Sequence, residues 1–137
     1  MGREWDKLVR LVAKLRSPTG CPWDRAQTHE SLIPYLREEA KEVEQALKKG
    51  RWHEIEDELG DLVLQVLLHS QIASEKKQFS IEDVARSQRL KLTRRHPHVF
   101  ADEKFKTPQD VKRNWAEIKG KERLQRDVDV KRRLKRR

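Results

Sequence analysis

Apolar residues recur along this chain with the three- and four-residue spacing of amphipathic helices, and no stretch alternates as a strand would. The spacing predicts a first helix over residues 3–16 and a second one that ends near residue 49. Thr28 or Ser31, both common capping residues, would start the second helix, and Gly50 would stop it. Pro34 then has to lie within the first turn, where a missing N–H costs nothing.

Three more helices follow in the pattern. One spans about 52–76, and a second begins after Ser80, which can cap it together with Asp83, and runs to about residue 95. The last begins at Thr107-Pro108, a capping residue followed by a first-turn proline, and its apolar stripe continues to Ile118. The sequence therefore predicts an all-α protein of about five helices.

The third of these helices is apolar nearly all round between Leu59 and Leu68. A helix of this kind is normally buried on every side, which a chain of 137 residues achieves most easily in a helical bundle shared by two copies. We therefore expect a homodimer or a higher homo-oligomer. Gly60, in mid-helix, costs about 1 kcal/mol relative to alanine, and close approach of a backbone or a ligand would explain it.

Acidic residues concentrate where the second and third helices meet. Residues 38–61 hold nine acids and four bases, a local charge of −5 in a chain of net charge +9. Glu39 and Glu42 are three residues apart, as are Glu58 and Asp61, so each pair projects from one helix face. If the two helices pack antiparallel, all four carboxylates converge.

Carboxylates that converge repel one another unless a cation lies between them, and a set without thiols or imidazoles suits Mg²⁺. A solvated, glutamate-rich helix surface is the other interpretation of the same spacing. Di-iron bundles are disfavoured, because Glu39 and Glu58 are not followed three residues later by histidine. The motifs of zinc proteases, phosphate-loop NTPases and α/β-hydrolases do not occur.

Basic residues complement the acids. Lys91, Arg94 and Arg95 lie on or just after one predicted helix, so a metal site and a phosphate-binding site would together suit phosphoryl transfer. Glu38 or one of the metal ligands would accept a proton from water. Trp115 offers an aromatic face for a base, although its helical spacing from Val111 and Ile118 is more typical of a core residue.

Other features narrow the class of protein. The chain is long enough for one domain, contains a single cysteine (Cys21, expected to be a packing residue), and shows no signal peptide or membrane-spanning run, so a cytoplasmic protein that does not bind membranes is expected. His29, His96 and His98 are expected to serve loop structure or phosphate contact more than a metal. Residues 121–137 carry a net charge of +6 and could bind nucleic acid, but a frayed, solvated tail is the simpler interpretation.

Several motifs together resemble the MazG-type nucleoside triphosphate pyrophosphohydrolases. The acidic positions match an EExxE…ExxD signature, in which Glu38-Glu39-Ala40-Lys41-Glu42 precedes Glu58-Leu59-Gly60-Asp61. The motifs GCPWD, QTHESL, ELGDLVLQV, RRHPHVF and WAEIK accompany it in the family's order, from residue 20 to residue 119. EExxE alone would be weak evidence, whereas the combined set is highly specific.

The resemblance implies a helical bundle completed by dimerisation, and cleavage of NTPs or dNTPs to a nucleoside monophosphate and pyrophosphate with Mg²⁺, or Mn²⁺ in its place. It implies a role in housecleaning of nucleotide pools. It assigns metal binding to Glu39, Glu42, Glu58 and Asp61, of which Glu39 and Glu42, with Glu38, would also be catalytic. Substrate binding would fall to Lys91, Arg94, Arg95 and Trp115.

The resemblance extends from the first helix to about Arg123. We therefore expect a MazG-like domain over residues 1–123 and a basic, disordered tail over 124–137. The motifs GCPWD and RRHPHVF look like those of the N-terminal copy in relatives with two tandem domains. A module that binds nucleotides or nucleic acid without turnover is the alternative to an enzyme.

Overall fold

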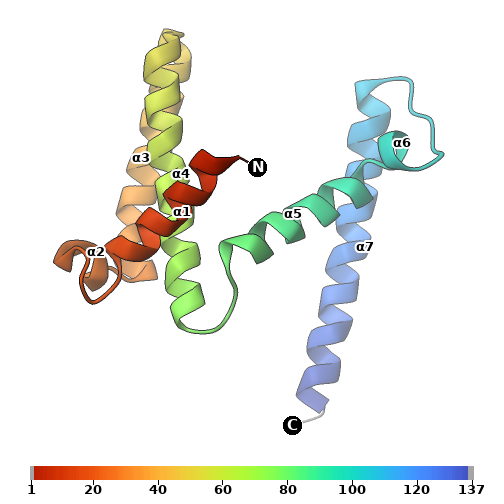
Figure 1. Ribbon diagram of the computed structural model, residues 1–137. Coiled ribbons are helices and arrows are strands. Elements are labelled where there is room, and N and C mark those ends of the chain that lie inside the picture. Colours follow the sequence, from red (N-terminus) through yellow and green to blue (C-terminus); the bar gives the residue numbers. More distant parts are fainter. Residues whose placement is uncertain (1, 136–137) are drawn as a thin grey trace. The chain divides into compact units, whose positions relative to one another are not determined.

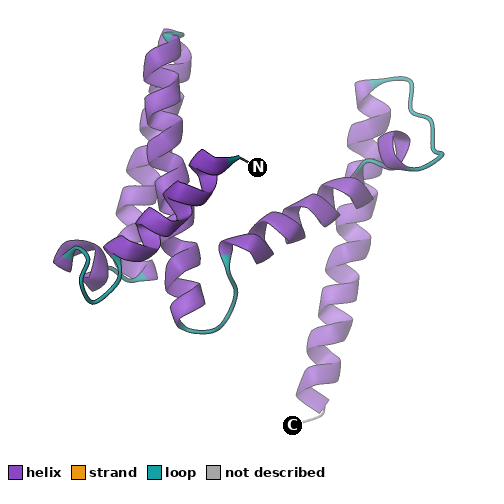
Figure 2. Ribbon diagram, viewed as in Figure 1, coloured by secondary structure: helices purple, strands orange, loops and turns teal. Residues whose placement is uncertain are grey.

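The computed structural model describes residues 2–135, and every regular element in this range is a helix (Figure 2). The all-α prediction is confirmed. The elements are α1 (Arg3–Leu15), α2 (Pro22–Ala26), α3 (His29–Lys49), α4 (Trp52–Glu75), α5 (Ile81–Arg95), α6 (Pro97–Phe100) and α7 (Pro108–Lys135). They divide into two compact units, Met1–Val84 and Ala85–Arg137, each of which is described by itself.

In the first unit, α3 and α4 form a long antiparallel hairpin, and α1 packs against α4 (Figure 1). Thr28 and Ser31 begin α3 as a reciprocal capping box, because the backbone N–H of each is bonded by the side-chain oxygen of the other. Gly50 ends α3 in the left-handed conformation, with φ 71°, which glycine adopts without steric cost. The predicted turn is therefore confirmed, and it places α4 alongside α3.

The core of this unit is small. Five side chains are almost fully buried and contact one another across α1, α3 and α4: Val12, Leu32, Leu67, Leu68 and Ile72. Within residues 2–135, α4 makes its main helix contacts with α3 and α1, and it is not buried on every side. Leu59 remains 44% exposed and Val66 42%.

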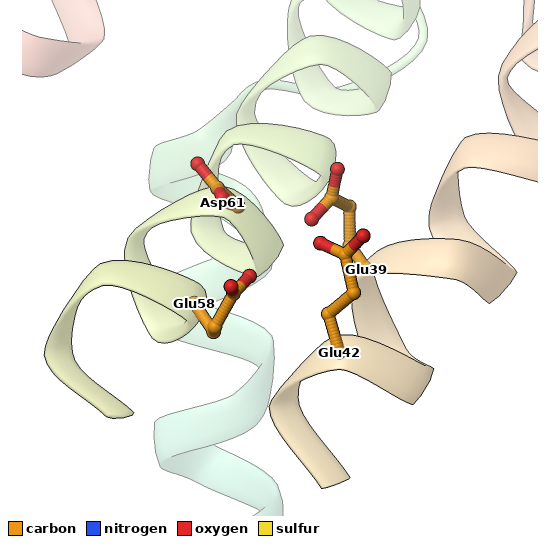
Figure 3. Close-up of side chains that lie close together, drawn as sticks. All are labelled: Glu39, Glu42, Glu58 and Asp61. Carbon is orange, nitrogen blue, oxygen red and sulfur yellow. The ribbon is translucent and has the colours of Figure 1, made fainter. Parts of the chain in front are cut away.

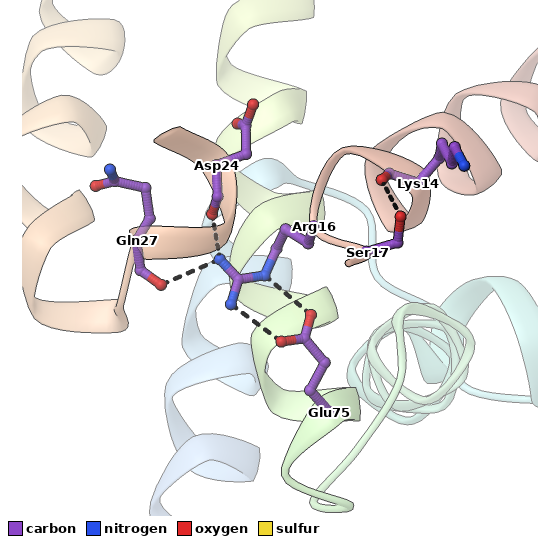
Figure 4. Close-up of polar contacts among 6 residues, drawn as sticks. All are labelled: Lys14, Arg16, Ser17, Asp24, Gln27 and Glu75. Carbon is purple, nitrogen blue, oxygen red and sulfur yellow. Dashed lines mark hydrogen bonds and ion pairs between the residues drawn. The ribbon is translucent and has the colours of Figure 1, made fainter. Parts of the chain in front are cut away.

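The buried side chain of Arg16 links the segment between α1 and α3 to this hairpin (Figure 4). The guanidinium of Arg16 donates to both carboxylate oxygens of Glu75, at 2.9 and 3.0 Å, and to the carbonyl oxygens of Asp24 and Gln27. The arginine side chain is only 7% exposed. It thereby satisfies one carbonyl group within α2, one just after α2, and the carboxylate of Glu75 at the end of α4.

The structure differs from the prediction at two short helices and at one proline. None of the predicted helices includes 22–26 or 97–100, but each of these segments forms a short helix that begins at a proline, which suits a first helical position. Pro34 lies beyond the first turn of α3, contrary to prediction. Its ring removes a bond to the carbonyl of Glu30, a solvent-exposed residue at which water can replace the bond.

In the second unit, α7 contacts the C-terminal end of α5, where Glu122 binds Arg94 and Arg95, and it is longer than its apolar stripe predicted. It continues from Pro108 to Lys135, so the tail is helical as far as the structure describes it, whereas disorder was expected. Lysine, arginine, glutamate and glutamine are good helix formers and sustain a helix without an apolar face. Arg136 and Arg137 lie outside the described residues.

None of the helices within residues 2–135 is long and apolar enough to cross a membrane.

Candidate functional site

Four carboxylates face one another across the α3–α4 hairpin (Figure 3). Glu39 and Glu42 project from α3, and Glu58 and Asp61 from α4. Each pair occupies successive turns of its helix, and the antiparallel course of the hairpin brings the two pairs to the same level. One oxygen of each side chain lies within 4.8 Å of an oxygen of every other, and all four residues are half-buried.

The acids perturb one another. Burial and the neighbouring negative charge of Glu42 raise the pKa of Glu39 to about 7. Burial, followed again by the charge of Glu42, also raises the pKa of Glu58. Near neutral pH this cluster therefore holds a proton that isolated glutamates would have released, and a bound cation would displace it.

Two oxygens in the cluster are available to a ligand. One carboxylate oxygen of Glu39 and one of Glu58 are shielded from solvent and accept no hydrogen bond from the described residues. An unpaired buried oxygen is costly, and coordination to a cation would remove that cost. Because all four donors are carboxylate oxygens, the group fits a hard divalent ion such as Mg²⁺ or Mn²⁺.

Glu38 is placed differently. It lies next to Glu39 in the sequence but is exposed, and it is not a member of the four-carboxylate cluster. Successive residues point about 100° apart around a helix, which explains the separation. A role for Glu38 as a proton acceptor remains a prediction.

The basic residues expected at the site belong to the second unit. Lys91, Arg94, Arg95 and Glu122 are among the residues that line a cavity of about 620 Å³ between α5 and α7. Arg94 and Arg95 both bind Glu122, with nitrogen–oxygen distances of 3.1–3.2 Å. Hydrogen bonds from Arg95 and then Arg94 lower the pKa of Glu122 to about 2, so this carboxylate is ionised at neutral pH.

Trp115 is half-buried beside this cavity and is engaged on two sides. The guanidinium carbon of Arg95 lies 5.4 Å from the centre of its ring, and His96 makes an edge contact at 4.9 Å between ring centroids. The core interpretation of Trp115 therefore describes its contacts in this structure. Binding of a base at Trp115 remains a prediction.

The histidines serve packing. His29 does not join His96 and His98 but stacks on His69, with ring planes 2° apart and a Nδ1–Nδ1 distance of 2.8 Å. Nδ1 of His96 donates a hydrogen bond to the carbonyl oxygen of Leu92, 2.6 Å away, so this nitrogen carries the proton. Within residues 2–135 no histidine belongs to a group of three or more potential metal ligands.

Sequence reasoning missed Glu122 and His69. Glu122 follows Trp115 by seven residues, which is two helical turns, so both residues lie on one face of α7. That spacing was available in the sequence and would have marked Glu122 as a partner for α5. Nothing local distinguishes His69, because its partner His29 is forty residues away.

Comparisons with known proteins agree with these observations. The family model described as MazG nucleotide pyrophosphohydrolase domain matches residues 27–100, which include the four-carboxylate cluster and Lys91 to Arg95. The chain is 49% identical over 119 residues to the nucleoside triphosphate pyrophosphohydrolase/pyrophosphatase MazG of Thermotoga maritima, covering 87% of this chain and 45% of that protein. It is 40% identical over 122 residues to the nucleoside triphosphate pyrophosphohydrolase of Escherichia coli K12, covering 88% of this chain and 46% of that one.

The chain thus spans less than half the length of these two relatives. Among solved structures, a MazG-related protein from Thermotoga maritima is similar over 84% of this chain and 98% of its own, with a TM-score of 0.69 and 29% identity. The likeness extends over nearly the whole of that protein, so a chain of this size can carry the fold.

Proposed function

The chain belongs to the MazG nucleotide pyrophosphohydrolase family, and on that premise we propose that it hydrolyses nucleoside triphosphates to nucleoside monophosphate and pyrophosphate. Ribo- and deoxyribonucleoside triphosphates are both proposed substrates, in keeping with clearance of nucleotide pools. The observation that carries the proposal is the convergence of Glu39, Glu42, Glu58 and Asp61 within 4.8 Å.

We propose that these four carboxylates hold Mg²⁺, with Mn²⁺ as a substitute. When bound, the ion would neutralise charge on the triphosphate and acidify a water molecule. Side chains of the protein would carry out the proton transfer. Glu39, whose pKa of about 7 belongs to the metal-free cluster, would give up its proton when the ion binds, and exposed Glu38 would accept a proton from water. Addition of this water across the α–β anhydride gives the two products.

Lys91, Arg94 and Arg95 are the proposed contacts for the phosphate oxygens. Their cavity is lined by five cationic residues and one acid, the remaining cations being Lys121 and Arg126. Lysine and arginine in such numbers favour a polyanionic ligand, and arginine pairs with phosphate through two parallel hydrogen bonds. Trp115 would contribute to the binding of the base.

Product analysis tests the proposal. Incubation with a panel of NTPs and dNTPs in Mg²⁺ should release nucleoside monophosphate and pyrophosphate, and Glu42→Gln should reduce turnover at least about a hundredfold, the loss typical of a key electrostatic group. Glu44→Gln is the matched control, because Glu44 is on the same helix but is exposed and paired with Lys48. Release of nucleoside diphosphate and orthophosphate would contradict the proposed reaction.

We propose that the active form is a homodimer. Several large apolar side chains of α3 and α4 are substantially exposed in the single chain: Ile33, Leu36, Leu47, Leu59 and Val66, with exposed fractions of 38–57%. Leu59 and Val66 belong to the apolar run of 59–68 from which the shared bundle was predicted. A second copy that covered them would complete the burial of α4.

Binding of nucleic acid by the basic end of α7 is a second candidate function. Lys131, Arg132 and Lys135 are exposed on that helix. Replacement of all three by glutamine should abolish retention on single-stranded RNA at low salt and leave NTP turnover unchanged. RNA retention that is equal in the variant and the parent protein would exclude this function for the tail.

A further inference from the structure

One carboxylate in the second unit is held by two arginines. Oε1 of Glu122 accepts from Nε of Arg94 and from Nε of Arg95, each at 3.2 Å, while Oε2 lies 3.1 Å from a terminal nitrogen of each. Both side chains at the centre of this group are largely shielded from solvent: that of Glu122 is 17% exposed and that of Arg95 is 11% exposed. Such paired, charge-assisted bonds fix the planes of both guanidinium groups.

The geometry leaves part of each guanidinium unused. Glu122 occupies the side edge of each group, formed by Nε and the terminal nitrogen Nη2. The remaining terminal nitrogen, Nη1, makes no hydrogen bond within the described residues for either arginine. A guanidinium carries five N–H donors, so each arginine keeps donors for a further anion while bound to Glu122.

Trp115 also contacts the guanidinium of Arg95. Its ring centre lies 5.4 Å from the guanidinium carbon, within range of a cation–π interaction. Trp115 and Glu122 lie two turns apart on one face of α7, and together they constrain the plane and the edge direction of the Arg95 guanidinium. Arg94 is 51% exposed and lacks a corresponding contact with Trp115.

The surrounding cavity retains a positive charge. Glu122 offsets one of its five cations, and Lys91, Lys121 and Arg126 form no ion pair within residues 2–135. A carboxylate at this place therefore does not neutralise the cavity. It lowers the repulsion between two adjacent guanidinium groups, which would otherwise turn away from each other into solvent.

We infer that Glu122 is a positioning residue, which orients Arg94 and Arg95 so that their free edges bind the polyphosphate chain of the substrate. This inference rests on the proposed function for the identity of the substrate. Glu122 acts through the arginines and does not contact the anion. Its loss weakens binding of the polyphosphate and leaves the chemistry at the four-carboxylate cluster unchanged.

The test compares Glu122→Gln with the parent protein in full-length form. We expect KM for the NTP to rise about tenfold with kcat nearly unchanged, since charge-assisted hydrogen bonds are lost but the side-chain shape is kept. Calorimetric binding of inorganic tripolyphosphate without a divalent ion should weaken by the same factor. Glu117→Gln is the matched control, because Glu117 is an exposed acid on the same helix that lines a different cavity.

A double-mutant cycle separates positioning from general stability. Arg95→Met should weaken tripolyphosphate binding by itself, and Glu122→Gln should cause a smaller loss in that background than in the parent protein, because one of the two arginines through which Glu122 acts is gone. Glu122→Asp, which keeps the charge, should retain more affinity than Glu122→Gln. Unfolding temperatures identify any variant that fails to fold. If Glu122→Gln fails to fold, Glu122→Asp takes its place in the comparison.

Three results would overturn the inference. These are unchanged tripolyphosphate affinity in Glu122→Gln, fully additive losses in the cycle, and tighter binding in Glu122→Gln, which would mean that the carboxylate competes with the anion. Because tripolyphosphate binding requires no turnover, the inference can be tested even if NTP hydrolysis is not found. Absence of tripolyphosphate binding by the parent protein would overturn it as well.

Discussion

At the scale of single residues, the chain maintains an unfavourable cluster of like charges. Glu39, Glu42, Glu58 and Asp61 lie close enough to raise the pKa of two members, although their helices could have carried neutral residues there. In the metal-free protein the cluster therefore lowers the free energy of unfolding. This is the pattern of a site whose geometry is set for a ligand and not for stability.

Glu39→Gln should stabilise the metal-free protein by about 1 kcal/mol near pH 8, because it removes one of four repelling carboxylates. The sign follows from the pKa, which is raised in the folded state from 4.5 to about 7. The folded protein binds more protons than the unfolded chain, so stability is lost as the pH rises through this window. Urea unfolding with and without Mg²⁺ measures the effect.

The same variant should lose the stabilisation that Mg²⁺ gives the parent protein, which would be about 2.7 kcal/mol at a hundredfold excess over Kd. Glu44→Gln should behave as the parent in both measurements. A Mg²⁺-dependent shift that survives in Glu39→Gln would contradict metal binding by this residue.

The pair His29 and His69 should give a pH dependence of stability with the opposite sign. Burial, and then the charge of His29, lower the pKa of His69 in the folded state. The unfolded chain then binds the proton more readily, so stability falls as the pH is lowered through the ordinary histidine range, from about pH 7.5 to about pH 5.5. The unfolding temperature of His69→Gln should fall less over this interval than that of the parent. Comparison at each pH cancels the contribution of the carboxylates, and equal slopes would refute the prediction.

At the scale of elements, α4 contains a mid-helix glycine, Gly60, whose small size is not required by any contact within the described residues. Gly60 has no protein atom near the position of an added Cβ, so no backbone within the described residues requires its small size. It does line a cavity of about 340 Å³ next to Asp61. The open space beside the acidic cluster suggests that a substrate or a second copy uses it.

Gly60→Ala should therefore raise the free energy of unfolding of the dilute, metal-free protein by about 1 kcal/mol, the difference in helix propensity between the two residues. It should lower NTP turnover, because the added methyl group occupies space at the edge of the site. Chemical denaturation and steady-state kinetics measure the two effects. Destabilisation in the dilute protein would show that the single chain already fills this space.

At the scale of the whole molecule, the proposed dimer depends on the exposed apolar side chains of α3 and α4. Leu59→Lys should convert a dimer to a monomer in light scattering and reduce stability at high protein concentration, because a charge would have to be buried at the interface. Leu124→Lys on α7, where Leu124 is 67% exposed, is the control and should leave the mass unchanged. A parent protein of monomeric mass would exclude the dimer.

Much of this arrangement could be predicted from the chain. The bounds of α1, α3, α4 and α5 follow from local rules: apolar spacing, the Thr28–Ser31 cap and the stop at Gly50. The pairing of Glu39 with Glu42, and of Glu58 with Asp61, follows from helix geometry. The short helices, the position of Pro34 and the length of α7 were missed, since a few tenths of a kcal/mol per residue separate helix from coil at such places.

By itself, the sequence determined an all-α chain, four paired acids on two helices and membership of its family, because these depend on spacing within a helix and on ordered motifs. Only the tertiary structure decided that the four carboxylates meet within 4.8 Å and that Glu122 holds Arg94 and Arg95. The physical reason is distance along the chain. A helix fixes the direction of residues three or four apart, whereas contacts between residues on different helices depend on how the helices pack.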